Sequence, residues 1–209
     1  MFQTHFYSLI TVALGVAAVT LPTCIPTTVP TIITRTVTAT ATVPVTTTTT
    51  VTTTTCTSSA PTNIVPLYRA YNGNIYDHFY TTDLNEFNNA VQNLQYSDEQ
   101  TACRLHPTAE QSTVPLYRMY SQSATDHFYT TSAEERDRAV QSLGYSDEGV
   151  AGYIYPQQSS VPGLVPLYRL YSGEVTDHFY TVSQTERDNT IGRLGYSDEG
   201  IAGYVFPPE

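Results

Sequence analysis

A unit of 43 residues occurs three times in this chain, and the copies at residues 65–107, 114–156 and 165–207 align without gaps. All variation in length falls in the two linkers between them, residues 108–113 and 157–164. A repeat of fixed internal length predicts one supersecondary unit per copy. A single unit is too short to bury a stable hydrophobic core, whereas three units packed together form a domain of ordinary size.

Each copy is predicted to fold as strand, strand, helix and strand. The segment Val-Pro-Leu-Tyr-Arg-x-Tyr alternates as a strand does, so that in copy one Leu67, Arg69 and Tyr71 share one face and Tyr68 and Ala70 the other. A short turn and the segment Asp-His-Phe-Tyr-Thr follow, which together predict a hairpin. The segment after Tyr-Ser-Asp-Glu is predicted to be the third strand.

The helix is predicted between the second and third strands. Phe87, Val91 and Leu94 have the spacing of one helix face. Gln95 stands where the other copies have a helix-ending glycine, so we expect a less regular end in copy one. A capping box, in which the cap accepts a backbone N–H and the glutamate returns a bond to the cap, is expected at the start. The three pairs are Asp83–Glu86, Ser132–Glu135 and Ser183–Glu186.

These elements predict a β-rich α+β fold in which the three strand-strand-helix-strand repeats close around a pseudo-threefold axis. The centre is expected to be β-trefoil-like or short-propeller-like. The alternative is an open linear stack, which should have atypical polar end copies. The last strand of copy one carries Thr101, Cys103, Arg104 and His106 in place of the residues of the other copies, and we expect it to be distorted or repurposed.

The first 62 residues contain no Asp or Glu and divide into two segments. Residues 1–18 have an apolar run of signal-peptide length and small residues suited to cleavage after Ala18; the alternative is an uncleaved membrane anchor. Residues 19–62 are rich in Thr and Pro and predict a disordered, O-glycosylated stalk. The alternatives are an unmodified linker or a β-prone Thr/Val strand. The globular part is expected to span 63–209, and the protein to be secreted or associated with a cell wall.

The charge composition excludes some partners. The net charge is −10, and all nine positive residues are arginine. Such a chain is a poor phosphate binder, so no nucleic-acid partner is expected, and no membrane partner after signal cleavage. The three cysteines are too few for a disulfide scaffold. One disulfide among Cys24, Cys56 and Cys103 is an open alternative, and Cys103, which has no partner inside the repeats, could cross-link to the stalk or to another chain.

A longer pattern runs through copies two and three, Tyr-Arg-x-Tyr, then Asp-His-Phe-Tyr-Thr, then Leu-Gly-Tyr-Ser-Asp-Glu-Gly-x-Ala-Gly-Tyr, and copy one departs from it at Gln95, Gln100, Cys103 and Arg104. It resembles a secreted repeat module of unknown function found in fungal and bacterial extracellular proteins, often beside cell-wall or polysaccharide hydrolases. The resemblance covers all three copies and is strongest in copies two and three. It implies secretion and suggests glycan or cell-wall binding, and it carries over no site residue.

The triplicated Asp-His-Phe-Tyr segment is the sharpest candidate site, because Asp and His are metal ligands and acid–base groups. One interpretation is three ligand pockets; a cruder one is a single metal held on the axis by three histidines. The structural alternative is a polar core between copies. Neighbouring strand residues point to opposite faces, so Asp and His of one copy are not expected to converge. The candidate ligand-binding residues are Asp77, His78, Tyr80, Asp126, His127, Tyr129, Asp177, His178 and Tyr180; no catalytic residue, metal or cofactor is assigned.

Three further features have competing interpretations. The Tyr-Ser-Asp-Glu carboxylates are expected in a solvated turn, the alternatives being a glycosidase pair or a Ca²⁺ site. The repeated arginine of the first strand is expected to pair with an Asp of a neighbouring strand, the alternative being a clamp on an acidic sugar. Most tyrosines are expected in the core, with one or two per copy in a groove that binds sugar. The arginines are Arg69, Arg118 and Arg169.

The sequence leaves three functions open. The first is a secreted, non-catalytic and multivalent module that binds polysaccharide or glycoprotein glycans. The second is a structural protein of the cell surface or wall without a small ligand. The third is a secreted hydrolase, which we disfavour because three equal copies rarely supply an asymmetric active site. The divergent Arg104 and His106 offer the one route to asymmetry.

Overall fold

The computed structural model describes residues 31–38, 46–53 and 63–209, which fall into two separate units. In the first unit, β1 (Thr31–Thr38) pairs antiparallel with β2 (Thr46–Thr53). The disordered stalk predicted for residues 19–62 has no regular structure, whereas these two segments agree with the alternative of a β-prone Thr/Val strand. Their many β-branched residues favour an extended backbone. The predicted signal peptide and the rest of segment 19–62 lie outside the described residues.

The second unit holds the three copies, and each folds as the predicted strand, strand, helix and strand. The elements of copy one are β3 (Val65–Asn72), β4 (Asp77–Thr81), α1 (Leu84–Asn93) and β5 (Ser97–Leu105). Those of copy two are β6 (Val114–Ser121), β7 (Asp126–Thr130), α2 (Ala133–Ser142) and β8 (Ser146–Ile154). Those of copy three are β9 (Val165–Ser172), β10 (Asp177–Thr181), α3 (Gln184–Leu194) and β11 (Ser197–Val205).

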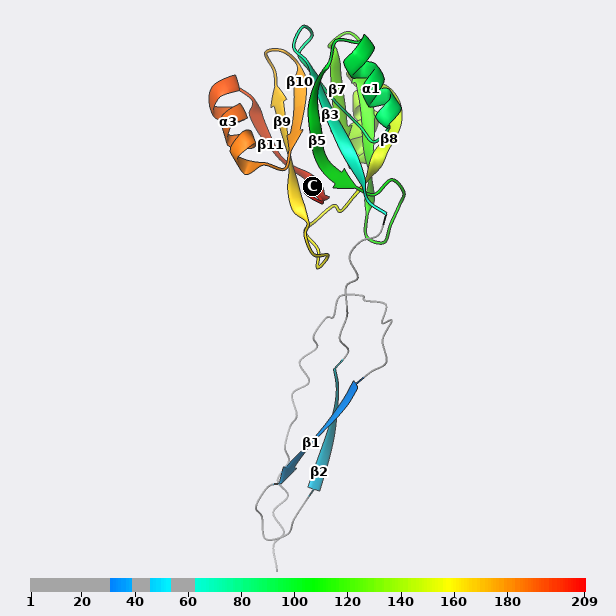
Figure 1. Cartoon of the computed structure of the whole chain (residues 1–209), viewed down its shortest axis with the longest axis vertical. Coiled ribbons are helices and arrows are strands. Elements are labelled where there is room, and N and C mark those ends of the chain that lie inside the picture. The colour runs from blue at the N-terminus through cyan, green and yellow to red at the C-terminus, as the bar shows by residue number, and fades with distance from the viewer. Residues whose placement is uncertain (1–30, 39–45, 54–62) are drawn as a thin grey trace, which may run out of the picture. The chain divides into compact units, whose positions relative to one another are not determined.

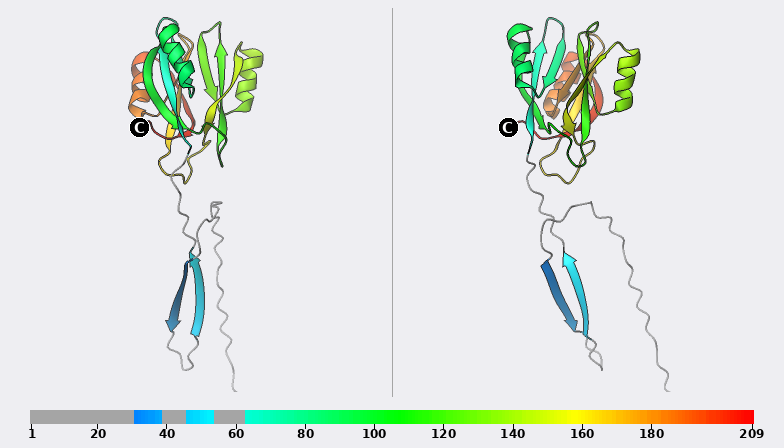
Figure 2. Two further views of the ribbon diagram at one scale, coloured as in Figure 1. Left: turned by 45° about the vertical axis from the view of Figure 1, so that its right-hand side comes forward. Right: turned by 90° about the vertical axis from the view of Figure 1, so that its right-hand side faces the viewer.

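Each copy forms its own antiparallel three-stranded sheet with the first strand in the middle, in the orders β4-β3-β5, β7-β6-β8 and β10-β9-β11. The helices lie on the outer faces of their sheets (Figures 1 and 2). In copy one, Phe87 and Ala90 of α1 pack on Ala70 and Phe79. Leu94, which has the spacing of the same helix face as Phe87, is 53% exposed because it caps the end of the helix.

The inner faces of the three sheets share one hydrophobic core. It contains one equivalent leucine from the first strand of each copy and one equivalent tyrosine from the second. The leucines are Leu67, Leu116 and Leu167, and the tyrosines are Tyr80, Tyr129 and Tyr180. Because side chains of all three copies meet here, the domain is a threefold arrangement and the open stack is excluded.

The sheets do not join into a barrel. The strands β4, β7 and β10 form the inner edges of the sheets, yet no backbone ladder links any two of them. The β-trefoil-like alternative is therefore wrong, since that fold closes its strands into a barrel; three separate sheets agree better with the propeller-like one. Backbone bridges do link the copies at the opposite edges, where the pairs are Arg104 with Phe206, His106 with Tyr153 and Tyr155 with Tyr204.

Copy one keeps the geometry of the other copies despite its divergent residues. Its last strand pairs with β3 through two register shifts, as β8 does with β6, so the expected distortion is absent. Gln95 ends the helix at φ 65°, close to the φ of 77° at Gly144 in copy two. The fold therefore imposes a left-handed conformation that glycine adopts more readily than glutamine. No helix in the described residues is long and apolar enough to cross a membrane.

Candidate functional site

The three core tyrosines form a closed ring of hydrogen bonds between copies. The Tyr129 hydroxyl accepts from the Tyr80 backbone N–H at 2.9 Å and donates to the Tyr80 carbonyl at 2.7 Å. Tyr180 does the same to Tyr129, and Tyr80 to Tyr180. The rings meet edge-to-face with centroids 5.4–5.5 Å apart. Burial raises the pKa of all three phenols well above the ordinary tyrosine value, so they remain neutral donors.

A second ring joins each aspartate to the histidine of another copy. Asp77 accepts from the backbone N–H of His127 at 2.9 Å and contacts its Nδ1 at 2.7 Å. It also accepts from the hydroxyl of Tyr96 in its own copy. The other pairs are His78 with Asp177 and His178 with Asp126. As predicted, Asp and His of one copy do not converge.

Side chains of both rings accept hydrogen bonds from backbone N–H groups of the inner edge strands. In β4, the N–H groups of His78 and Tyr80 have no neighbouring strand; Asp177 accepts from the first and Tyr129 from the second. Buried N–H and C=O groups need such partners. The side chains of Asp-His-Phe-Tyr therefore replace the strand pairing that would have closed a barrel. A fixed geometry at three equivalent interfaces accounts for the identity of this segment in all copies.

The nine candidate ligand residues are thus unequally placed. The three aspartates are 0% exposed and the three tyrosines at most 2%, so a ligand on the surface reaches neither set. The histidine side chains keep about a tenth of their surface, at 11–12%. Within the described residues, carboxylate oxygens of the three aspartates lie within 4.8 Å of one another. Each carboxylate already accepts protein hydrogen bonds, so this cluster carries no metal assignment, and the three histidines do not meet on the axis.

Outside these rings, an arginine of each copy binds the capping-box glutamate of another copy. Both terminal nitrogens of Arg118 contact Glu86, at 2.9 and 3.0 Å, and its Nε lies 2.9 Å from Glu148. Arg169 binds Glu135 in the same way, and Arg69 binds Glu186. The expected partner was an Asp of a neighbouring strand; the actual partners are glutamates, one of them on a neighbouring helix.

These ion pairs also change the capping boxes. Asp83 accepts from the Glu86 N–H as predicted, but Glu86 returns no bond to the cap. The cap N–H donates to the Thr81 hydroxyl instead, and Glu86 accepts from Thr81 and Arg118. A charged, bidentate arginine is a stronger partner than a neutral amide N–H. Burial alone would raise the pKa of Glu86, but the bonds from Arg118 and Thr81 outweigh it and lower that pKa.

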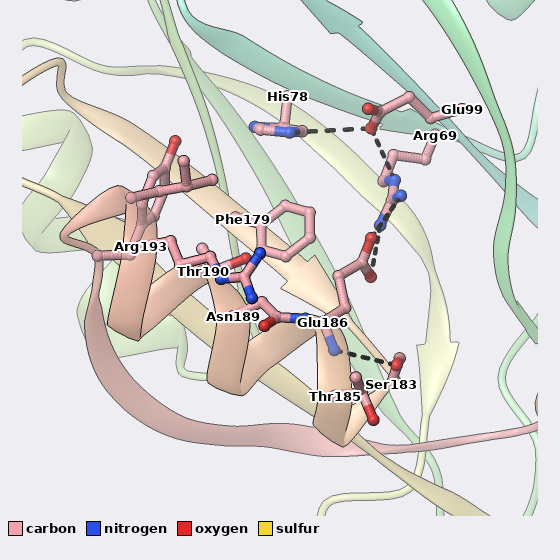
Figure 3. A pocket seen from close by; sticks show the side chains of 12 residues that line it. Arg69, His78, Glu99, Phe179, Ser183, Thr185, Glu186, Asn189, Thr190 and Arg193 are labelled. Carbon is pink, nitrogen blue, oxygen red and sulfur yellow. Dashed lines mark hydrogen bonds and ion pairs between the residues drawn. The ribbon is translucent and has the colours of Figure 1, made fainter.

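Two clefts between copies are lined by glutamates of these ion pairs. The larger, which we call the 3/1 cleft, lies between α3 and the side chains Arg69, His78 and Glu99 of copy one, with a volume of about 590 Å³ (Figure 3). In Figure 3, Arg69 connects Glu99 to Glu186, and the Phe179 ring lies beside them. The second, the 2/3 cleft, lies between α2 and copy three, with a volume of about 280 Å³.

The floors of the two clefts contain equivalent residues, and their rims differ. His178 and Glu199 take the places in the 2/3 cleft that His78 and Glu99 take in the 3/1 cleft. The rim residues come from exposed helix positions that are not identical between copies. Position for position, Asn189 and Arg193 of α3 correspond to Arg138 and Ser142 of α2 and to Asn89 and Asn93 of α1. The leucine after these residues is exposed in all three, at 66% for Leu194, 57% for Leu143 and 53% for Leu94.

The divergent residues of copy one contribute to the packing and form no separate site. Cys103 is fully buried, and burial raises the pKa of its thiol to about 12. It has no disulfide partner in the described residues, and Cys24 and Cys56 lie outside them. Arg104 donates to the Pro207 carbonyl, and His106 contacts the Asn63 carbonyl and the Tyr155 hydroxyl.

The adjacent carboxylates of Tyr-Ser-Asp-Glu have separate structural roles. They lie at the start of the last strand, where a solvated turn was expected. Asp98 accepts from the backbone N–H of Gln100, which holds the first irregularity of β5, and Glu99 pairs with Arg69. With different partners and directions, they do not form the paired carboxylates of a glycosidase.

Sequence reasoning missed the clefts and the role of the capping-box glutamates. The signal for the glutamates was present, because Arg and Glu recur at fixed positions in every copy. The sequence of one copy does not indicate that its arginine pairs with the glutamate of another copy. The rim residues were missed because they differ between copies, and only the helix placement brings them over a shared floor.

Comparison with family models gives one match. A model described as a domain of unknown function, DUF5648, matches residues 66–206 and so includes all three copies. Comparison with curated proteins and with solved structures found no match. The matched segment coincides with the threefold domain and its clefts, and the chain belongs to the DUF5648 family of domains of unknown function.

Proposed function

We propose that residues 63–209 form a secreted, non-catalytic carbohydrate-binding module whose ligands occupy the clefts between copies. The observation that carries this proposal is a cleft of one design found at two equivalent interfaces, with a constant floor and a variable rim. A constant floor preserves the fold, and a variable rim gives each cleft its own selectivity.

The chemistry of the 3/1 cleft suits a sugar. Sugars offer hydroxyls for polar side chains and apolar C–H faces for rings and aliphatic groups. Thr185, Asn189 and Glu186 supply the polar groups, and the exposed Leu194 an apolar one. Phe179 is buried beneath Arg69 and forms part of the floor. The ion pairs below hold the floor rigid, which reduces the ordering cost of binding.

The carboxylates of the clefts favour binding over catalysis. Glu186 receives the Arg69 fork and the Thr181 hydroxyl, and burial alone would raise its pKa, but these bonds lower it. A glutamate held in its charged form by an arginine is a poor general acid. Weak binding at repeated clefts would be strengthened on a polymer, where linked sites raise the apparent affinity roughly 10²- to 10⁴-fold.

A second candidate is a structural cap that needs no ligand. The specific observation in its favour is the saturation of the Asp-His-Phe-Tyr segment, whose Asp and Tyr side chains are buried and bonded between copies. The two candidate functions make different predictions for the rim residues. A binding module needs them to contact the ligand, whereas a structural cap gives them no role.

The test is retention of the secreted full chain on insoluble chitin, β-glucan, mannan and peptidoglycan. Asn189→Trp fills the 3/1 cleft from an exposed helix position, and Gln184→Trp adds the same ring at an exposed position of α3 that does not line the cleft. Retention on one polymer that is reduced by Asn189→Trp and kept by Gln184→Trp supports the module. Retention by none, or equal retention by both variants, refutes it and leaves the structural cap.

Secretion and the glycosylated stalk are part of the same proposal. Val19 is expected as the first residue of the protein recovered from culture medium, because small residues precede it at the end of the apolar run. Mass spectrometry of the intact protein should show hexose additions on residues 19–62. An intact Met1 or an unmodified stalk would contradict these expectations.

A further inference from the structure

Two arginines of the globular domain differ from the rest in having no carboxylate partner. Residues 63–209 contain eight arginines, and six of them form ion pairs with Asp or Glu. The remaining two, Arg138 and Arg193, form none within the part of the chain that the structure describes. The acidic side chains outnumber the arginines in this domain, so unpaired guanidinium groups are unexpected.

Both unpaired arginines line clefts. Arg193 stands in the last turn of α3 and lines the 3/1 cleft (Figure 3), and Arg138 lines the 2/3 cleft from α2. They come from different helix positions. Arg193 of α3 corresponds to Ser142 of α2, and Arg138 of α2 corresponds to Asn189 of α3. Each of the two clefts therefore has one exposed cation at its rim, and the two cations occupy helix positions about one turn apart.

The cleft floors cannot supply the missing partners. Glu186 and Glu99 are engaged by Arg69 in the 3/1 cleft, and Glu135 and Glu199 are engaged by Arg169 at the 2/3 interface. Each floor holds two carboxylates against one guanidinium, so the unpaired rim arginine is the group of the cleft that can attract an anion. Its planar fork matches carboxylate and phosphate oxygens.

We infer that the 3/1 and 2/3 clefts take a sugar that carries an anionic group, and that Arg193 and Arg138 bind this group. The inference rests on the proposed carbohydrate-binding function and names its ligand class. The interface of α1 with copy two has Asn89 and Asn93 at the two positions, so it lacks this selectivity. The anion is a carboxylate, as in a uronic acid, or a phosphate ester.

The experiment measures binding of the full chain to oligogalacturonate, to the same oligomer with its carboxyl groups reduced to alcohols, and to phosphorylated mannan, by calorimetry at two salt concentrations. The variants are Arg193→Gln, Arg138→Gln and the double variant. Arg187→Gln is the matched control, because Arg187 lies on the same helix as Arg193 but pairs with Asp188 and Asp198 and does not line the cleft.

We expect one anionic ligand to bind at least tenfold more tightly than the neutral oligomers, with affinity that falls as salt rises. The double variant should lose this tenfold preference, and Arg187→Gln should keep it. The preferred ligand distinguishes carboxylate from phosphate. Binding of neutral glycans as tight as that of anionic ones, or a double variant that binds like the unmodified chain, overturns the inference but keeps the proposed function. No binding to any glycan, charged or neutral, overturns both.

Discussion

Removal of one hydroxyl from the tyrosine ring tests whether side chains replace strand pairing at the centre of this domain. Tyr129→Phe leaves the N–H and the C=O of Tyr80 without partners in a residue that is 1% exposed. An unsatisfied buried polar group costs about 1–3 kcal/mol, so two of them should lower the free energy of unfolding by about 3 kcal/mol. Urea denaturation followed by near-UV circular dichroism measures the loss, since the chain has 17 Tyr and 0 Trp.

The symmetry of the ring supplies further tests. Tyr80→Phe and Tyr180→Phe break equivalent pairs of bonds and should cost the same within about 0.5 kcal/mol. Tyr76→Phe is the matched control, because Tyr76 is 50% exposed, and it should change the free energy of unfolding by less than about 0.5 kcal/mol. A loss below about 1 kcal/mol for Tyr129→Phe, with an unchanged denaturant slope, would show that the ring does not support the edge strands.

Three further predictions follow from the contacts between and within copies. Gln95→Gly should raise the free energy of unfolding by about 0.5–1 kcal/mol, since φ is 65° there, whereas Gln92→Gly inside α1 should lower it by a similar amount; thermal melting of both variants measures this. Gly203→Ala should lower the melting temperature, because a Cβ there lies 2.5 Å from Ile154 Cδ1 and 2.9 Å from the Tyr155 carbonyl, and Ile154→Val in the same chain should restore part of the loss. Burial alone would raise the pKa of each capping glutamate in the folded state, but bonds from arginine and threonine outweigh it and lower that pKa. The stabilisation from these glutamates is therefore present above the unfolded-state pKa of about 4.3 and is lost as pH falls through the folded-state values. Urea midpoints at pH 6 and pH 3 should therefore differ less in Glu135→Gln than in the unmodified chain; an equal difference would contradict this role.

The packing around Cys103 shows how a change in one copy is accommodated. Cys103 takes the position of Gly152 and Gly203, where a Cβ would meet Leu105 and Ile154. By the same correspondence, the residue opposite Cys103 is Val205, which is smaller than its counterparts and lies in the same buried cluster. The extra volume of the cysteine is thus matched by a smaller side chain in another copy, and the last strand keeps its register.

The order of elements in a copy was predictable because it depends on local signals. Alternation in the first strand, the turn before Asp77 and the cap at Asp83 each act within a few residues. The exposure of Leu94 was not predictable in this way, since helical spacing does not show where the helix ends against its sheet. The left-handed conformation of Gln95 was hidden because the fold imposes a conformation that the residue itself disfavours.

The threefold repeat and the separation of Asp from His within one copy could both be predicted, because they follow from spacing along the chain. Which copy supplies each partner depends on how the copies pack: Asp77 binds His127 of copy two, and Glu86 binds Arg118 of copy two. Three identical segments allow pairing within a copy or between copies, and the sequence of one copy is the same in either case. The geometry of the inner edge strands, which lack neighbouring strands and must bond to side chains of the other copies, decides between them.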